Sequence, residues 1–132
     1  VHAPLMSNVE IEIDEASGII RVTPAKPVTV DDACAAIDAI IEQPGFRKGL
    51  PSIWDMRFTE LMHINADDIR RISEHADSVK EQRGDARIAF IVNSDLAYGL
   101  GRMFEMVNAT SHIRARVFRH YEEGEAWALA RD

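Results

Sequence analysis

The sequence predicts a single α/β domain built on a mostly parallel five-stranded sheet, with one antiparallel edge strand and helices on both faces. Three observations predict this fold. Apolar residues first recur with a period of two, and segments of helical period then alternate with short apolar runs. Strands that alternate with helices require right-handed crossovers between parallel strands. The length of 132 residues is typical of one domain. The expected order of elements is β-β-α-β-α-β-α-β-α.

The first two strands are expected to form a hairpin. Val9, Ile11 and Ile13 alternate with acidic residues, residues 14–18 have turn chemistry, and residues 19–23 return as the second strand. Residues 9–132 make up the predicted domain. Residues 1–8 lack the basic and apolar regions of a signal peptide, and we expect them to be disordered or derived from cloning.

The first helix is predicted from its end signals. Thr29 and Asp32 have the spacing of a helix N-cap, and Pro44 and Gly45 end the segment. The single cysteine, Cys34, is expected on the core-facing side of this helix, where burial raises a thiol pKa. One cysteine allows no internal disulfide, so the expected compartment is the reducing cytoplasm.

The remaining strands and helices alternate along the chain. Residues 51–56 read as a short buried strand, and the near-continuous apolar run at residues 86–92 is typical of a strand covered on both faces. A second helix opens at Asn65 or Asp67, with Ile69, Ile72, Ala76 and Val79 inside and Lys80 and Glu81 on its solvated side. A third helix is capped by Ser94 or Asp95, residues 114–118 form the last strand, and Glu122 begins a short helix.

The chain resembles a known family over residues 9–129. Four segments carry the resemblance: VEIEIDEASGIIRV, IIEQPGFRKGLPSIWDMR, RIAFIVNSDLAYGLGRMFE and ARVFRHYEEGEAWAL. These segments resemble the SpoIIAA-like family, relatives of the STAS domains of bacterial anti-sigma-factor antagonists. The resemblance implies the fold far more than a function.

One departure from the family pattern concerns regulation. In phosphorylated members, an Asp-Ser-Ser-Gly-type motif follows the aspartate that ends the third strand. Counted from Asp55, this chain has His63-Ile64-Asn65-Ala66 at that place, with no hydroxyl to accept a phosphate. The anti-sigma phosphorylation switch is therefore not expected here.

Charge and composition exclude several classes of partner. The net charge of −7 repels phosphate backbones and anionic lipid surfaces, so nucleic acid is not an expected partner. No apolar run approaches the ~18 residues of a membrane span, so stable membrane insertion is not expected. The histidines are dispersed, which predicts no metal site and no cofactor. Gly99 and Gly101 lie inside a predicted helix, where glycines favour close approach of a neighbour over phosphate binding.

The sequence also lacks the signals of an enzyme. No Gly-x-Ser-x-Gly motif surrounds Ser94, whose expected role as a helix cap accounts for it fully. The prediction is therefore that the protein is not an enzyme.

One polar constellation is a candidate binding site. In a parallel sheet the carboxyl ends of neighbouring strands meet, and ligands bind in the crevice there. The residues expected at that edge, for a small ligand or an acidic peptide group, are Asp55, Arg57, Asn93, Ser94, Tyr98 and Arg102. In the alternative interpretation, Asp55 binds loop amides and an arginine pairs with it to hold the loops.

Three functions follow, in order of preference. The first is a non-enzymatic STAS-like binding or regulatory module that recognises a protein partner or itself, as a homodimer. The alternative is a small carrier for an apolar or amphipathic, lipid-like ligand, favoured by the Met- and Phe-rich segments 56–58, 61–62 and 103–106. An enzyme ranks third, and it would have to use Asp55, Arg57, Ser94 and Arg102.

Overall fold

The computed structural model describes residues 9–25, 27–61, 63–109, 111 and 113–130, and residues 1–8, expected to be disordered or derived from cloning, lie outside them. The strands are β1 (Val9–Asp14), β2 (Ile19–Pro24), β3 (Ser52–Asp55), β4 (Arg87–Ile91) and β5 (Arg114–Phe118). The helices are α1 (Val30–Ile41), α2 (Ala66–Ser78), α3 (Lys80–Arg83), α4 (Asp95–Val107) and α5 (Tyr121–Leu129), with the 3-10 turn η2 (Met56–Phe58) after β3.

The strands form one five-stranded sheet whose order, β1-β2-β3-β4-β5, follows the sequence. β1 and β2 pair antiparallel, and the other three neighbouring pairs are parallel. The hairpin turn needs Gly18, which has a φ of 78° and donates its N–H to the Asp14 carbonyl at 2.7 Å. The predicted sheet, with its antiparallel edge strand, is confirmed.

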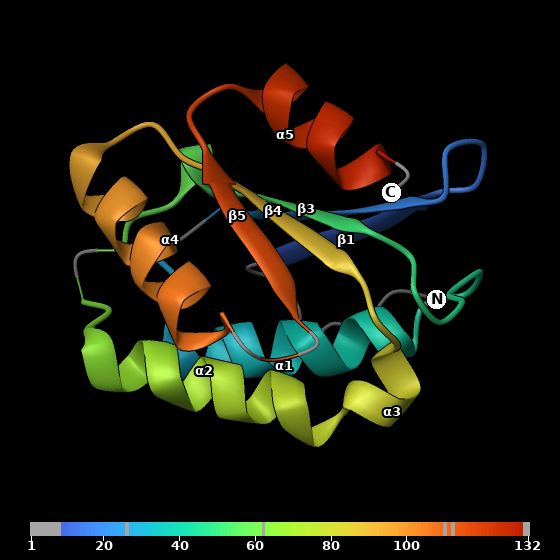
Figure 1. Ribbon diagram of the computed structural model, residues 1–132, viewed down its shortest axis with the longest axis horizontal. Coiled ribbons are helices and arrows are strands. Elements are labelled where there is room, and N and C mark those ends of the chain that lie inside the picture. Colours follow the sequence, from blue (N-terminus) through green and yellow to red (C-terminus); the bar gives the residue numbers. More distant parts are fainter. Residues whose placement is uncertain (1–8, 26, 62, 110, 112, 131–132) are drawn as a thin grey trace.

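Helices cover both faces of this sheet, as predicted, but unequally. Figure 1 shows α5 on one side and α1 and α2 on the other. Beneath α5, Ile53, Ile91 and Phe118 belong to a buried cluster to which α5 contributes Ala128. The helix approaches closely because Gly124 has no side chain; a Cβ there would overlap Ile91.

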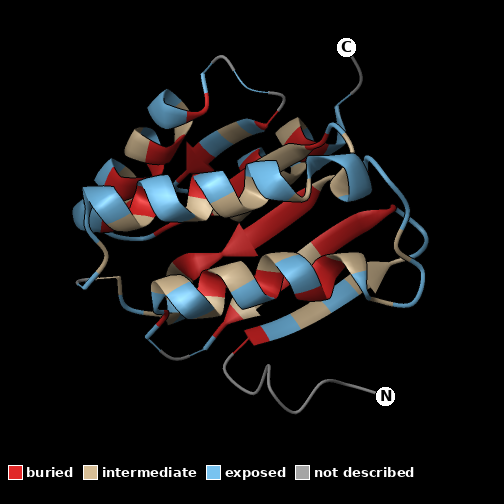
Figure 2. Cartoon of the chain, turned by 90° about the horizontal axis from the view of Figure 1, so that it is seen from below, coloured by how far each residue is buried: buried red, intermediate tan, exposed pale blue. Residues whose placement is uncertain are grey.

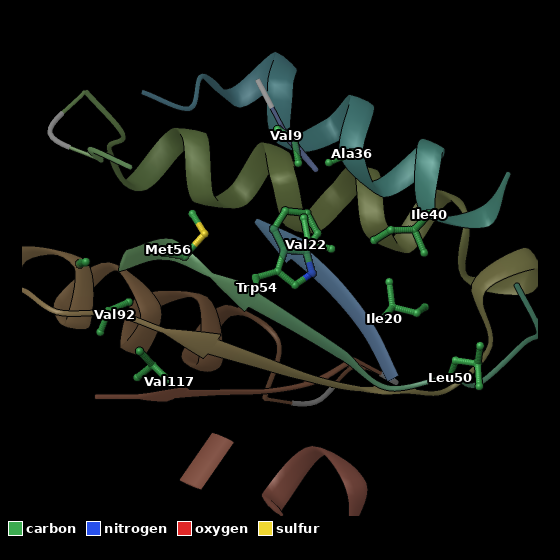
Figure 3. Packing of buried hydrophobic residues seen from close by; sticks show 11 residues of the cluster. Val9, Ile20, Val22, Ala36, Ile40, Leu50, Trp54, Met56, Val92 and Val117 are labelled. Atoms are coloured by element: carbon green, nitrogen blue, oxygen red, sulfur yellow. The ribbon is translucent and has the colours of Figure 1, made fainter. Parts of the chain in front are cut away.

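The opposite face carries the larger core. Ile20, Val22 and Trp54 of the sheet pack with Ala36 and Ile40 of α1 in one cluster. In Figure 3, Trp54 lies between its strand and the helices above it. A neighbouring cluster joins α2 and α4 through residues that include Ile69, Leu100 and Phe104.

α2 rests on its two neighbouring helices. It packs against α1 along one flank and against α4 along the other, and only Ile69 and Ser73 of its residues are fully buried. Figure 2 shows the largely exposed outward faces of α1 and α2. Polar contacts fasten α2 at both flanks: His75 Nε2 lies 2.9 Å from Asp38 Oδ1 on α1, and Ser73 Oγ donates to Asn108 Oδ1, just after α4, at 2.6 Å.

The prediction of one helix continuing through Lys80 and Glu81 is wrong. α2 ends at Ser78, Val79 leaves the helical conformation with φ −113° and ψ 18°, and α3 begins at Lys80. Ser78 Oγ donates to the His75 carbonyl at 2.6 Å, a bond from side chain to preceding turn that bends helices. The break changes the direction of the chain before Arg83.

Candidate functional site

The predicted site lies where β3 and β4 end side by side. Asp55 is the last residue of β3 and pairs in register with Ile91, the last residue of β4. Asn93, two residues beyond the end of β4, therefore lies at the same edge of the sheet. Asp55 is buried, and it caps η2 by accepting from the Arg57 amide at 3.2 Å.

Asp55 and Arg57 form a closed ion pair. Arg57 Nε donates to Asp55 Oδ1 and Nη2 donates to Oδ2, both at 2.8 Å. The hydrogen bonds to Asp55 raise the pKa of Arg57 above its usual range. This two-pronged arrangement uses the guanidinium fork on a partner from the same loop. The geometry agrees with the alternative interpretation, in which Asp55 binds a loop amide and an arginine.

Further contacts fix the Arg57 loop. The guanidinium carbon of Arg57 lies 5.4 Å from the ring centre of Phe58 and 5.5 Å from that of Tyr121. Asn93 Nδ2 donates to the Arg57 carbonyl at 3.2 Å, which ties the end of β4 to η2. The structure thus brings Asp55, Arg57 and Asn93 together.

The other predicted residues have partners of their own along α4. Ser94 caps this helix by accepting from the Ala97 amide at 3.1 Å, as predicted. The Arg119 guanidinium lies 4.3 Å from the ring centre of Tyr98.

Arg102 faces a different neighbour. Its Nη1 donates to Glu105 Oε1 at 2.6 Å, while Glu105 Oε2 accepts from the Val117 amide of β5 at 2.7 Å. Arg102 therefore contacts the carboxylate that links α4 to β5, rather than Asp55. A ligand role for the six predicted residues stays a prediction.

A second locus, which the sequence indicated only through its Met- and Phe-rich segments, is a cavity of about 120 Å³ between α1, α2, α4 and the sheet. It exists because α2 bridges α1 and α4 above the strands. Its lining is almost entirely apolar; its larger side chains include Ile37, Ile40, Trp54, Ile69, Ile72, Ile88, Phe90, Leu100 and Phe104. Ile69, Ile72, Ala76 and Val79, predicted on the inner face of the second helix, all line it.

Two polar side chains also line this cavity. Ser52, at the start of β3, is 1% exposed, and its Oγ has no hydrogen-bond partner among the described residues. The same holds for both terminal nitrogens of Arg83, which are buried although the residue as a whole is half-buried. Buried polar atoms nearly always have partners in proteins, so three orphaned atoms on two residues that line one cavity are unusual.

The environment of Arg83 is unusual for a guanidinium. Burial lowers the pKa of Arg83 to about 10. The aromatic ring of Phe46 lies 5.8 Å from the guanidinium carbon, a contact that offsets only part of the cost of burial.

The described residues lack two further kinds of site. They contain no group of three or more His, Cys, Asp or Glu side chains arranged to hold a metal ion. Over the same part of the chain, no helix has both the length and the apolar character that a membrane crossing requires.

Comparison with known proteins identifies the architecture. An uncharacterised DUF3478-family protein from Shewanella loihica PV-4, whose crystal structure is described as having a SpoIIAA-like fold, superposes with a TM-score of 0.58. The alignment covers 91% of both chains at 12% sequence identity. The chain has a SpoIIAA-like fold. Known family models and curated proteins give no match.

Within the SpoIIAA-like fold, the segment expected to differ from phosphorylated relatives opens α2. Asn65 is the N-cap of this helix, and its Oδ1 accepts from the Asp68 amide at 2.9 Å. The side-chain amide of Asn65 therefore caps a helix in the segment where the family resemblance would place a phosphoacceptor.

Proposed function

We propose that the chain is a binding module that holds a small, largely apolar ligand in the cavity beneath α2 and does no chemistry on it. The observation that carries the proposal is the cavity itself, which is lined by side chains from three helices and the sheet. Apolar cavities of about 150 Å³ can hold a molecule the size of benzene. A cavity of about 120 Å³ therefore suits a chain or ring of about six carbons.

The polar edge of the sheet supports binding over catalysis. Asp55 and Arg57 satisfy each other, and Ser94 caps α4. An enzyme built on these residues would have to break the Asp55–Arg57 pair to use either one. The carrier hypothesis is thus the better supported of the functions expected from the sequence.

The first experiment is native mass spectrometry of the freshly purified protein. A protomer that carries the extra mass of one small molecule is the expected result. Binding of hexan-1-ol, followed by NMR, then tests whether the cavity admits an apolar chain. Absence of both retained mass and hexan-1-ol binding would contradict the proposal.

A matched pair of variants on α1 locates the binding site. Ala33 lines the cavity, whereas Ala35 is exposed on the same helix. Ala33→Leu fills part of the cavity and is expected to abolish binding of hexan-1-ol, while Ala35→Leu should leave it unchanged. Equal binding by both variants would place the ligand elsewhere.

Recognition of a protein partner, or of a second copy, is a further candidate. Two large apolar side chains, Phe58 in η2 and Leu96 in the first turn of α4, are 61% and 55% exposed. The same mass spectra test this hypothesis, because a dimer without added mass would favour it over the carrier.

A further inference from the structure

We propose that the ligand is an aliphatic carboxylic acid of about six carbons, with its carboxylate bound by Arg83 and Ser52 and its chain in the apolar cavity. This inference rests on the proposed function and specifies its ligand class. It follows from the three orphaned polar atoms, all of which belong to residues that line the same cavity.

The topology brings Arg83 and Ser52 to one end of the cavity. Ser52 pairs in register with Ile88 at the start of the parallel strands β3 and β4. The Arg83 carbonyl accepts from the Gly49 amide at 2.9 Å, in the loop that leads into Ser52. A Cβ at Gly84 would come within 2.8 Å of the Gly49 nitrogen, so only glycine permits this close approach. Both side chains therefore lie at the amino edge of the sheet, on the face that α2 covers.

The donors at this end select an anion. Arg83 offers N–H groups in a planar fork, and Ser52 offers one hydroxyl. Water could accept these hydrogen bonds, but it would leave the guanidinium charge without a counter-charge in an apolar setting, which is costly. An anionic ligand group satisfies the donors and the charge together.

Charge balance favours a carboxylate over a phosphate. One guanidinium balances the single negative charge of a carboxylate, whose two oxygens match the fork. A phosphate monoester carries about 1.5–2 negative charges at neutral pH and would leave excess charge buried. The apolar remainder of the lining accepts only a hydrocarbon chain.

The test compares hexanoate with hexan-1-ol by isothermal titration calorimetry. The two probes share a chain of the same length and differ in the charged head. Hexanoate is expected to bind the native protein more than about tenfold more tightly, because a hydrogen-bonded charged group contributes about 1.5–3 kcal/mol.

Three variants assign that preference to residues. Arg83→Met should remove the preference for hexanoate while keeping binding of hexan-1-ol, which also shows that the cavity is intact. Ser52→Ala should weaken hexanoate by about three- to tenfold, and this variant serves if Arg83→Met does not fold. Arg47→Met, which removes an exposed arginine that does not line the cavity, should bind both probes as the native protein does.

The outcomes separate this inference from the proposed function. Equal affinity for the two probes would overturn the carboxylate assignment and leave an apolar binding cavity. Failure of both to bind would overturn the cavity function as well. A hexanoate preference that survives both Arg83→Met and Ser52→Ala would place the carboxylate elsewhere on the protein.

Discussion

Arg57 holds Asp55 through two hydrogen bonds, from Nε to Oδ1 and from Nη2 to Oδ2, each 2.8 Å long. The two residues are two positions apart in the chain: Asp55 ends β3, and Arg57 belongs to the turn η2 that follows it. The pair therefore stabilises this turn. Arg83, by contrast, has a guanidinium of the same kind whose terminal nitrogens have no such partner among the described residues. The guanidinium that lacks a partner thus belongs to a residue of the cavity lining and not to the carboxyl edge of the sheet.

Asp55→Asn is expected to lower the free energy of unfolding by about 1–3 kcal/mol, because it removes the charged acceptor of Arg57 in a buried position. Urea denaturation measures the change. Asp67→Asn is the control, since Asp67 pairs with Arg70 on an exposed surface of α2 and should cost at most about 1 kcal/mol. Equal losses in the two variants would show that the Asp55–Arg57 pair stabilises no more than a surface pair.

Gly101→Ala is expected to destabilise the protein by about 1–3 kcal/mol through overpacking. A Cβ at Gly101 would lie 2.6 Å from Val117 Cγ2, so α4 would have to move away from β5. Gly99→Ala, in the same helix, meets nothing within 4 Å and should stabilise by about 1 kcal/mol, the usual gain of alanine over glycine in a helix. Thermal unfolding of the two variants gives the comparison; a stabilising Gly101→Ala would contradict the close approach.

Arg83→Met is expected to raise the free energy of unfolding of the ligand-free protein by about 1–3 kcal/mol at neutral pH. Burial lowers the pKa of Arg83 from the usual value of arginine to about 10, so the folded state binds the proton less tightly than the unfolded state. The resulting loss of stability is fully present below about pH 10 and disappears as the pH rises from there toward the usual pKa of arginine. The substitution removes the buried charge, and with it the loss of stability, but it also removes the contact of the guanidinium with Phe46.

Urea denaturation of Arg83→Met, with Arg47→Met as the exposed control, tests the sign of this effect. A loss of stability, as large buried residues usually show on substitution, would mean that the guanidinium is compensated in the ligand-free protein. Adding hexanoate should reverse the order, stabilising the native protein but not Arg83→Met.

Cys34 is expected to alkylate more slowly in the folded protein than in the unfolded chain at neutral pH. It is half-buried on α1, so the prediction of a core-facing position holds only in part. Burial raises its pKa above the usual value of a thiol, and the thiolate is the reactive form. The pH profile of iodoacetamide reaction should have its midpoint at a higher pH in the folded protein than in the urea-unfolded chain; an equal or lower midpoint would contradict the role of burial.

The fold could be predicted because its signals are local. Thr29, Asn65 and Ser94 each cap a helix through a hydrogen bond to a backbone amide three residues on. The apolar run that contains β4 divides between the two faces: Phe90 packs toward α4 and Ile91 toward α5. Such patterns depend on neighbours along the chain, which a sequence displays directly.

The candidate site depended on contacts that a sequence does not display. Arg102 shares a helix with Tyr98, but Glu105, three residues later, supplies its partner. Arg83 is the last residue of a charged and polar segment, residues 80–83, whose sequence is typical of the solvated end of a helix. It faces the cavity only because the helix breaks at Val79 and α2 bridges two others. Of the Met- and Phe-rich segment at residues 61–62, Met62 lies outside the described residues.

The order of the strands has a consequence for synthesis of the chain. Because the sheet is ordered as the sequence is, each new strand can add to the growing edge as it leaves the ribosome. Among the described residues, only those of α5 cover the face that contains Ile53 and Ile91, so this face stays open until residues 121–129 have been made. A nascent chain arrested before that point would display a sheet with one finished face and one apolar face, which is the kind of surface that chaperones bind.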